Sequence, residues 1–100
     1  MAETDVKIVV RIKDCIEQCG GNYPSWYVGR AEYPEEALVA HGVSLDKNRH
    51  IYFTAATIEE AKSIVHYFMT RLGTDGNRCG PCDEKALSIY AYEKSATTHP

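Results

Sequence analysis

The sequence predicts a single α+β domain, in which a small and mainly antiparallel sheet packs against two helices. Three observations indicate this fold class. The chain has 100 residues, of which 44% are hydrophobic and 25% charged, the size and composition of one soluble domain. Four segments have the pattern of strands, and two have the pattern of helices. We expect residues 1–100 to form one domain, ordered over about residues 5–94, with a short flexible tail over residues 95–100.

The four predicted strands are distributed along the whole chain. The first covers residues 6–13, "VKIVVRIK", where Val6, Ile8, Val10 and Ile12 share one face of a period-two pattern. The second covers residues 26–31, "WYVGRA", after a glycine-rich connection. The third and fourth are "RHIYFTA" over residues 49–55 and "ALSIYAYEK" over residues 86–94. Together with the two helices they predict the order β-β-α-β-α-β.

The two predicted helices have recognisable starts and ends. Pro34 fits the first turn of a short helix, because its missing N–H is not needed there, and Gly42 is a plausible end. Thr57 followed by Glu60 is a capping box that begins a longer helix, and Gly73 ends it. Apolar residues recur along this helix at a spacing of three and four: Ile58, Ala61, Ile64, Val65, Phe68, Met69 and Leu72. We therefore expect these residues, including Val65, to lie in the core.

The segment "SWYVGRAEYPEEALVAH", residues 25–41, carries a family resemblance. A strand with "YVG", a proline-opened helix that ends near a histidine, a third strand and a long helix resemble the GIY-YIG nuclease domain over residues 6–72. The resemblance implies metal-assisted cleavage of a phosphodiester. Its site would have a tyrosine in each of the first two strands, an arginine in the first helix and a metal-binding glutamate in the long helix. Tyr27 matches the second tyrosine, Gly29 the glycine after it, and His41 a histidine at the end of the first helix.

Three other positions depart from the family pattern. Val10 stands where the first tyrosine is expected, Ala37 where the arginine is expected, and Val65 where the glutamate is expected. None of these side chains can bind a metal, donate to a phosphate or transfer a proton. Arg30 is close to the hairpin, but it belongs to a different element from the expected arginine.

The sequence therefore predicts a catalytically degenerate nuclease-like domain that acts as a non-catalytic binding or accessory module. Its candidate binding residues are Tyr27, Gly29, Arg30 and His41. The alternative is a divergent metal-dependent nuclease that acts on DNA or RNA, with Tyr27 and His41 as remnants of its catalytic site. Tyr27 is also explained as a packed aromatic residue, and His41 as a residue that contacts the carbonyl groups at the end of its helix.

The four cysteines form two closely spaced pairs. Cys15 and Cys19 are separated by three residues, and Cys79 and Cys82 by two. Such pairs allow both sulfurs to reach one ion, so the four thiols predict a structural zinc site. The stretch "CGPC" also resembles the redox motif of thioredoxins, although it precedes a strand rather than a helix. A third interpretation is four unrelated free thiols.

Charge and composition restrict the possible partners. The net charge of −3 gives no general attraction to nucleic acid. The sheet face opposite the helices, however, would combine basic and aromatic side chains able to contact phosphates and to stack on bases. These residues are Lys7, Arg11, Lys13, Tyr52, Tyr90 and Tyr92. Nucleic acid is therefore a candidate partner.

The acidic N-terminus "MAETDVK" and the lack of an apolar run of about 20 residues predict a cytoplasmic protein without a membrane partner. No small-molecule cofactor is indicated.

Overall fold

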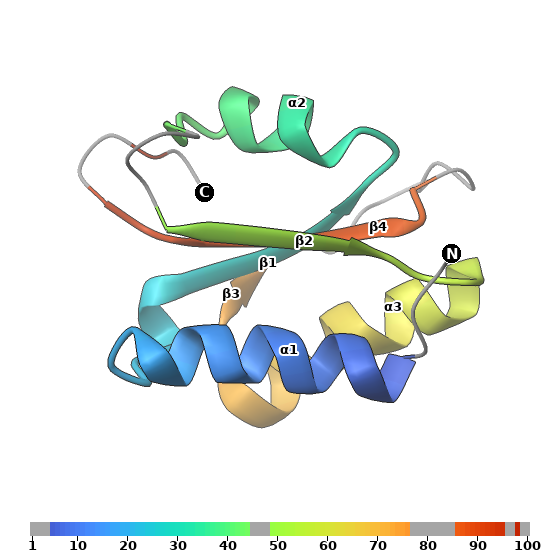
Figure 1. Ribbon diagram of the computed structural model, residues 1–100, viewed down its shortest axis with the longest axis horizontal. Coiled ribbons are helices and arrows are strands. Elements are labelled where there is room, and N and C mark those ends of the chain that lie inside the picture. Colours follow the sequence, from blue (N-terminus) through green and yellow to red (C-terminus); the bar gives the residue numbers. More distant parts are fainter. Residues whose placement is uncertain (1–4, 45–48, 77–85, 96–97, 99–100) are drawn as a thin grey trace.

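A computed structural model describes residues 5–44, 49–76, 86–95 and 98. These residues form three layers, with a sheet between one short helix and a pair of longer helices (Figure 1). The α-helices are α1 (Asp5–Gln18), α2 (Pro34–Ala40) and α3 (Ile58–Tyr67). The strands are β1 (Trp26–Ala31), β2 (His50–Thr54), β3 (Asp75–Gly76) and β4 (Ser88–Glu93). A 3-10 turn over Tyr23–Ser25 precedes β1, and a π-helical turn over Phe68–Leu72 continues α3. The predicted α+β class is confirmed.

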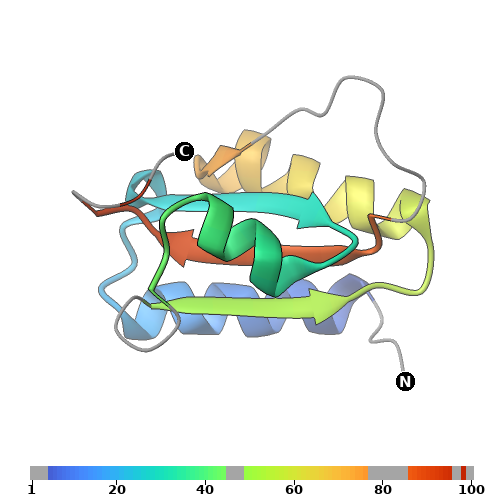
Figure 2. The same cartoon turned by 90° about the horizontal axis from the view of Figure 1, so that it is seen from above.

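The sheet is mixed, and its strand order is β2-β4-β1-β3. β4 runs antiparallel to both of its neighbours, β1 and β2. The short β3, which was not predicted, pairs with β1 in parallel. Figure 2 shows the sheet from above, with β2 along one margin and α2 lying across its middle.

The first element is a helix, so the predicted strand over residues 6–13 is wrong. Ile8, Ile12 and Ile16 are fully buried and are spaced by four residues, which places them on one face of α1. The period-two pattern arose because Val6 and Val10 are also apolar, yet both are exposed. The β-branched residues favour a strand locally, but packing of the isoleucine stripe against the sheet overrides that preference. In the described residues the order is therefore α-β-α-β-α-β-β, and it differs from the order that the nuclease resemblance implies.

The structure confirms the two predicted helices as α2 and α3 and the residues that cap them. Pro34 occupies the first turn of α2, and Gly42 follows it in the left-handed conformation with φ 82°. The hydroxyl of Thr57 accepts a hydrogen bond from the backbone N–H of Glu60 at 3.1 Å, as expected of a helix N-cap. Gly73, with φ 81°, ends the π-helical turn that continues α3.

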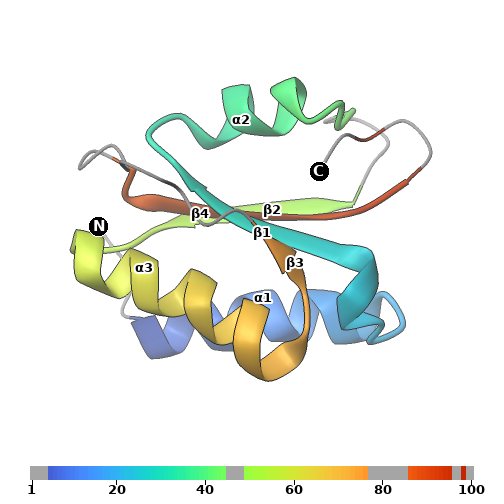
Figure 3. The ribbon, with the colours of Figure 1, turned by 180° about the vertical axis from the view of Figure 1, so that it is seen from behind.

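Each face of the sheet has its own core. On one face, alternate residues of β1 and β4 pack against α1 and α3. Figure 3 shows these two helices on the same side of the sheet. The buried residues of this core are Ile8, Ile12, Ile16, Trp26, Val28, Ala55, Ala61, Ile64, Val65, Phe68, Ile89 and Ala91. On the other face, the remaining alternate residues pack beneath α2 and the segment after it. This second core contains Tyr27, Leu38, Val43, Tyr90 and Tyr92.

The predicted open face of basic and aromatic residues is wrong. The prediction placed both helices on one face of the sheet, whereas α2 covers the face that carries Tyr90 and Tyr92. Tyr90 is almost completely buried and Tyr92 is fully buried, so neither ring can stack on a base. Lys7, Arg11 and Lys13 belong to α1, which packs on the opposite face of the sheet. The six residues therefore do not share one surface.

Among the described residues, no helix has the length and apolar character required to cross a membrane. Thr98, within the predicted flexible tail, is buried and exchanges hydrogen bonds with Ser95. The other residues of the tail after Ser95 lie outside the described part of the chain.

Candidate functional site

Three tyrosines and a histidine lie together beneath α2. Tyr27 comes from β1, Tyr90 and Tyr92 from β4, and His41 from the C-terminal end of α2. The ring centroid of His41 lies 4.8 Å from that of Tyr27, 5.7 Å from that of Tyr90 and 5.5 Å from that of Tyr92. The ring of Tyr27 is stacked on that of Tyr92, with centroids 5.2 Å apart. We call these four residues the tyrosine–histidine cluster.

The strand register brings the three tyrosines together. Tyr27 is directly opposite Tyr92 in the antiparallel pair of β1 and β4, and Gly29 is directly opposite Tyr90. Residues that face each other across a ladder project to the same side of the sheet. Positions 90 and 92 are two residues apart on one strand, so their side chains also share that side.

Gly29 provides the space that Tyr90 occupies. A Cβ atom at position 29 would lie 2.7 Å from the hydroxyl oxygen of Tyr90, 2.8 Å from its Cζ atom and 3.2 Å from Cε1 of Tyr27. Contacts this short require the ring to move. Gly29, a predicted binding residue, thus leaves room in the structure for the aromatic ring of Tyr90.

His41 links the end of α2 to the sheet. Its backbone N–H points back to the last carbonyl groups of the helix, and Gly42 then turns the chain so that Val43 is buried. Its Nε2 atom is hydrogen-bonded to the Tyr90 hydroxyl at 2.9 Å. The expectation that His41 contacts the terminal carbonyls is therefore met by its backbone, whereas its ring contacts the tyrosines.

Tyr92 is the most enclosed member of the tyrosine–histidine cluster. It is fully buried, and its hydroxyl has no hydrogen-bond partner among the described residues. Burial raises the pKa of this phenol above its ordinary value, and the nearby Tyr27 and Asp75 raise it further. Tyr92 therefore stays protonated and uncharged near neutral pH, which makes it a packing group rather than a nucleophile.

The structure brings together only part of the predicted nuclease site. Tyr27 and His41 are in ring contact, and Ala37 packs against the same core. Val10 and Val65 belong to α1 and α3, which cover the opposite face of the sheet. Val65 is 6% exposed, so its predicted position in the core is confirmed. The positions that correspond to the family's catalytic residues thus lie on both sides of the sheet, and they do not surround one cleft.

Arg30, a predicted binding residue, has a structural contact. It is half-buried, and its Nη1 atom donates a hydrogen bond to the carbonyl oxygen of Ala86 at 3.0 Å. Ala86 precedes β4, so the contact holds the end of β1 to the chain that enters β4. Arg30 alternates with Gly29 along the strand and projects away from the tyrosine–histidine cluster.

The structure describes two of the four cysteines of the predicted zinc site. Cys15 and Cys19 lie one helical turn apart at the end of α1, where both are half-buried against the core. Burial raises the pKa of the Cys15 thiol, and the adjacent Cys19 raises it further through its charge and a hydrogen bond. Cys79 and Cys82 lie outside the described residues. In the described part of the chain, no group of three or more His, Cys, Asp or Glu residues could hold a metal ion.

A strand over residues 6–13 paired antiparallel with the last strand would bring the two cysteine pairs to one edge of the sheet. The structure does not have this pairing, because α1 replaces the first predicted strand and β4 pairs with β1 and β2. β4 begins at Ser88, which is opposite Ala31 at the end of β1. Cys19 precedes the other end of β1, where Trp26 is opposite Glu93. Cys19 and the start of β4 therefore lie towards opposite ends of this strand pair. The zinc site stays a prediction without this topological support.

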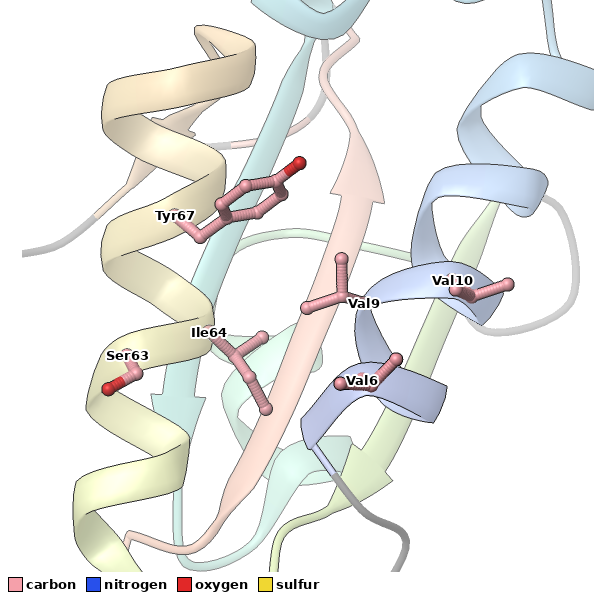
Figure 4. Close-up of a pocket in the computed structure, with 6 residues that line it drawn as sticks. All are labelled: Val6, Val9, Val10, Ser63, Ile64 and Tyr67. Carbon is pink, nitrogen blue, oxygen red and sulfur yellow. The ribbon is translucent and has the colours of Figure 1, made fainter.

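A groove between α1 and α3 was not predicted from the sequence. It has a volume of about 320 Å³ and is lined by Val6, Val9, Val10, Ser63, Ile64 and Tyr67 (Figure 4). Val6 is 68% exposed and Val10 is 49% exposed, which is unusual for large apolar side chains grouped on one helix. A helical reading of residues 5–18 would have placed both residues on the outer side of α1, away from the isoleucine stripe. We call this surface the α1–α3 groove.

Comparison of the chain with protein families, with curated proteins and with solved structures gave no match.

Proposed function

We propose that this chain is a non-catalytic binding module that holds an apolar segment of a protein partner in the α1–α3 groove. The observation that carries the non-catalytic part is the position of Tyr27 and His41. Tyr27 is almost entirely buried, and His41 is in ring contact with it and hydrogen-bonded to Tyr90. A nuclease must instead present such groups to a phosphate in a cleft, next to a cation and a metal.

The remaining positions support the same conclusion. Ala37 carries no charge, and Val10 and Val65 lie on the other side of the sheet from Tyr27. Removal of one charged group at such a site commonly reduces the rate by about 10²-fold or more. Even with non-additive effects, replacement of three groups leaves a site with almost no activity.

The binding part rests on the α1–α3 groove. Its lining is largely apolar, and Val6 and Val10 extend it onto the outer surface of α1. The described part of α1 is about 21 Å long, from 14 residues at about 1.5 Å per residue. A groove between two helices accepts side chains that an amphipathic helix presents at a spacing of three and four residues. The partner chemistry that fits is therefore an apolar helical face.

Two measurements test the proposal separately. In the first, the purified protein is incubated with supercoiled plasmid and with single-stranded oligonucleotides in Mg²⁺ or Mn²⁺. We expect no cleavage. Metal-dependent nicking that disappears in Tyr27→Phe or His41→Ala would overturn the non-catalytic assignment and favour a divergent nuclease.

The second measurement uses Nile red, an uncharged fluorescent dye, as an apolar probe of the groove. Val10→Lys should lower dye binding severalfold, because it places a charge on the groove lining. Val39→Lys is the matched control, since Val39 is a similarly exposed valine on α2. Near-ultraviolet circular dichroism confirms that both variants keep their tertiary structure. Equal dye binding by the two variants would contradict a role for the groove.

A further inference from the structure

β2 is an outer strand of the sheet. The strand order is β2-β4-β1-β3, so β4 lies along one side of β2 and no described strand lies along the other. Figure 2 shows β2 at the margin of the sheet, with α2 displaced towards the middle. On the opposite face, the Arg11 guanidinium from α1 lies 5.8 Å from the centre of the Phe53 ring. Arg11 thus contacts one face of β2 rather than its outer edge.

The backbone hydrogen bonds show which groups point outwards from β2. Just before the strand, the N–H of Glu93 donates to the carbonyl of Arg49 at 3.1 Å. Just after it, the N–H of Ala55 donates to the carbonyl of Leu87 at 2.9 Å. In an antiparallel ladder, residues alternate between pointing at the neighbouring strand and pointing away from it. The odd-numbered residues therefore bond to β4, and the backbone groups of Tyr52 and Thr54 point away from it.

The sequence of β2 lacks the features that usually prevent edge pairing. Outer strands are commonly protected by charged residues, proline or a bulge. β2 is "HIYFT", which contains no lysine, arginine, carboxylate or proline and is rich in residues that favour strands. Its pairing with β4 is continuous over all five residues, so no bulge interrupts it.

We propose that β2 pairs antiparallel with β2 of a second copy of this chain, about a two-fold axis at Tyr52. In this register Tyr52 lies opposite its own copy, and Ile51 lies opposite Phe53 of the second copy. Aromatic pairs and pairs of aromatic with β-branched residues are the favourable cross-strand neighbours. The arrangement places no like charges opposite each other within the strand. The product is one continuous sheet across two copies, with identical surfaces at the interface.

The side chains around the axis are already held in place. The Tyr52 hydroxyl donates a hydrogen bond to Glu35 on α2 at 2.5 Å, and the hydroxyls of Thr54 and Ser88 are hydrogen-bonded at 3.1 Å. These contacts reduce the conformational freedom that pairing would otherwise cost. Five paired residues form a small interface, so we expect a weak, concentration-dependent dimer.

Analytical ultracentrifugation tests the proposal over about 10 µM to about 1 mM, where weak interfaces become populated. The wild type should change from monomer to dimer over this range. Tyr52→Lys should remain monomeric, because it places two ammonium groups opposite each other. Tyr52→Pro should also remain monomeric, because it removes an outward N–H without removing a bond to β4. Val39→Lys, on α2, should dimerise as the wild type does.

Hydrogen exchange of the wild type gives a readout that does not depend on a variant folding. The amide of Tyr52 should become more protected as the protein concentration rises, whereas the amide of Ile51, already bonded to β4, should not change. A chain that is monomeric at all concentrations would overturn the proposal. A dimer that persists in Tyr52→Lys would also overturn the proposal. Loss of the dimer in Val10→Lys would overturn it too, and would assign the contact between the copies to the α1–α3 groove.

Discussion

The Nε2 atom of His41 and the hydroxyl of Tyr90 are hydrogen-bonded at 2.9 Å, although the two residues are 49 positions apart in the chain. This contact joins the end of α2 to β4, the strand at the centre of the tyrosine–histidine cluster. α2 is only seven residues long, and Leu38 is its only buried residue. Such a short helix is not stable in isolation, so its position depends on contacts at its end.

The first prediction concerns the coupling between His41 and Tyr90. A double-mutant cycle with His41→Ala and Tyr90→Phe should show an interaction free energy of about 1 kcal/mol, the usual net value of a hydrogen bond in a folded protein. Urea unfolding of the four proteins measures it. His66→Ala, on the exposed side of α3, replaces His41→Ala in the control cycle and should give an interaction free energy near zero. Additive effects of His41→Ala and Tyr90→Phe would show that the contact contributes nothing to stability.

The second prediction concerns Gly29. Gly29→Ala should lower the free energy of unfolding by about 1–3 kcal/mol, because the added methyl group overlaps the Tyr90 ring. The combination with Tyr90→Leu, which removes the overlapping atoms, should be less destabilising than the sum of the two single changes. Denaturant unfolding is the measurement. If Gly29→Ala changes the free energy by less than about 0.5 kcal/mol, as at a surface position, the ring has room to move.

The third prediction concerns Val65, where the nuclease resemblance expects glutamate. Val65→Glu should lower the free energy of unfolding by at least about 3 kcal/mol, because it buries an unpaired carboxylate in the core beneath α3. The adjacent His66→Glu is the matched control, since residue 66 is exposed on the same helix and should tolerate the charge. Thermal unfolding compares the two. Similar melting temperatures for both variants would mean that residue 65 is accessible to water.

The fourth prediction concerns the buried hydroxyl of Tyr92. Its pKa in the folded state is raised above the value of about 10 of an unfolded tyrosine. The corresponding stabilisation is fully present below pH 10 and is lost as the pH rises above it, because the unfolded chain then releases the proton first. Wild-type stability should therefore fall from about pH 10 upwards.

Tyr92→Phe separates the contribution of this hydroxyl from other alkaline effects. The variant removes a buried polar group that lacks a hydrogen-bond partner in the described structure, so it should raise the free energy of unfolding at pH 7 by about 1 kcal/mol. It should also be less sensitive than the wild type to pH above about 10. Denaturant unfolding at several pH values measures both effects. Identical pH profiles for the two proteins would show that residue 92 does not titrate in the unfolding transition.

The elements with local signals were predictable from the sequence. Pro34 and Gly42 mark the ends of α2, and Thr57 and Gly73 mark the ends of the second helical segment. β1 covers the predicted residues 26–31, and β2 and β4 lie within their predicted segments. These signals act between residues that are close in the chain, so they do not require the rest of the fold.

The candidate site was predictable only in part. Tyr27 and His41 were identified from the sequence, and the structure places their rings in contact. Tyr90 was expected on an open surface, but it is covered by α2 and hydrogen-bonded to His41. Whether an alternating strand shows a given face to solvent depends on which side the neighbouring helix packs, and residues 34–40 contain no local signal for that side.

The amino-acid sequence by itself determined the α+β class, the ends of α2, the start of α3 and the core position of Val65, because capping groups and apolar spacing act over a few residues. Only the tertiary structure decided that residues 5–18 form a helix, that α2 covers the tyrosines and that β2 is an outer strand. The physical reason is that burial of Ile8, Ile12 and Ile16 against the sheet outweighs the local preference of β-branched residues for a strand. That free energy comes from contacts between distant parts of the chain, which a local reading of residues 6–13 does not contain.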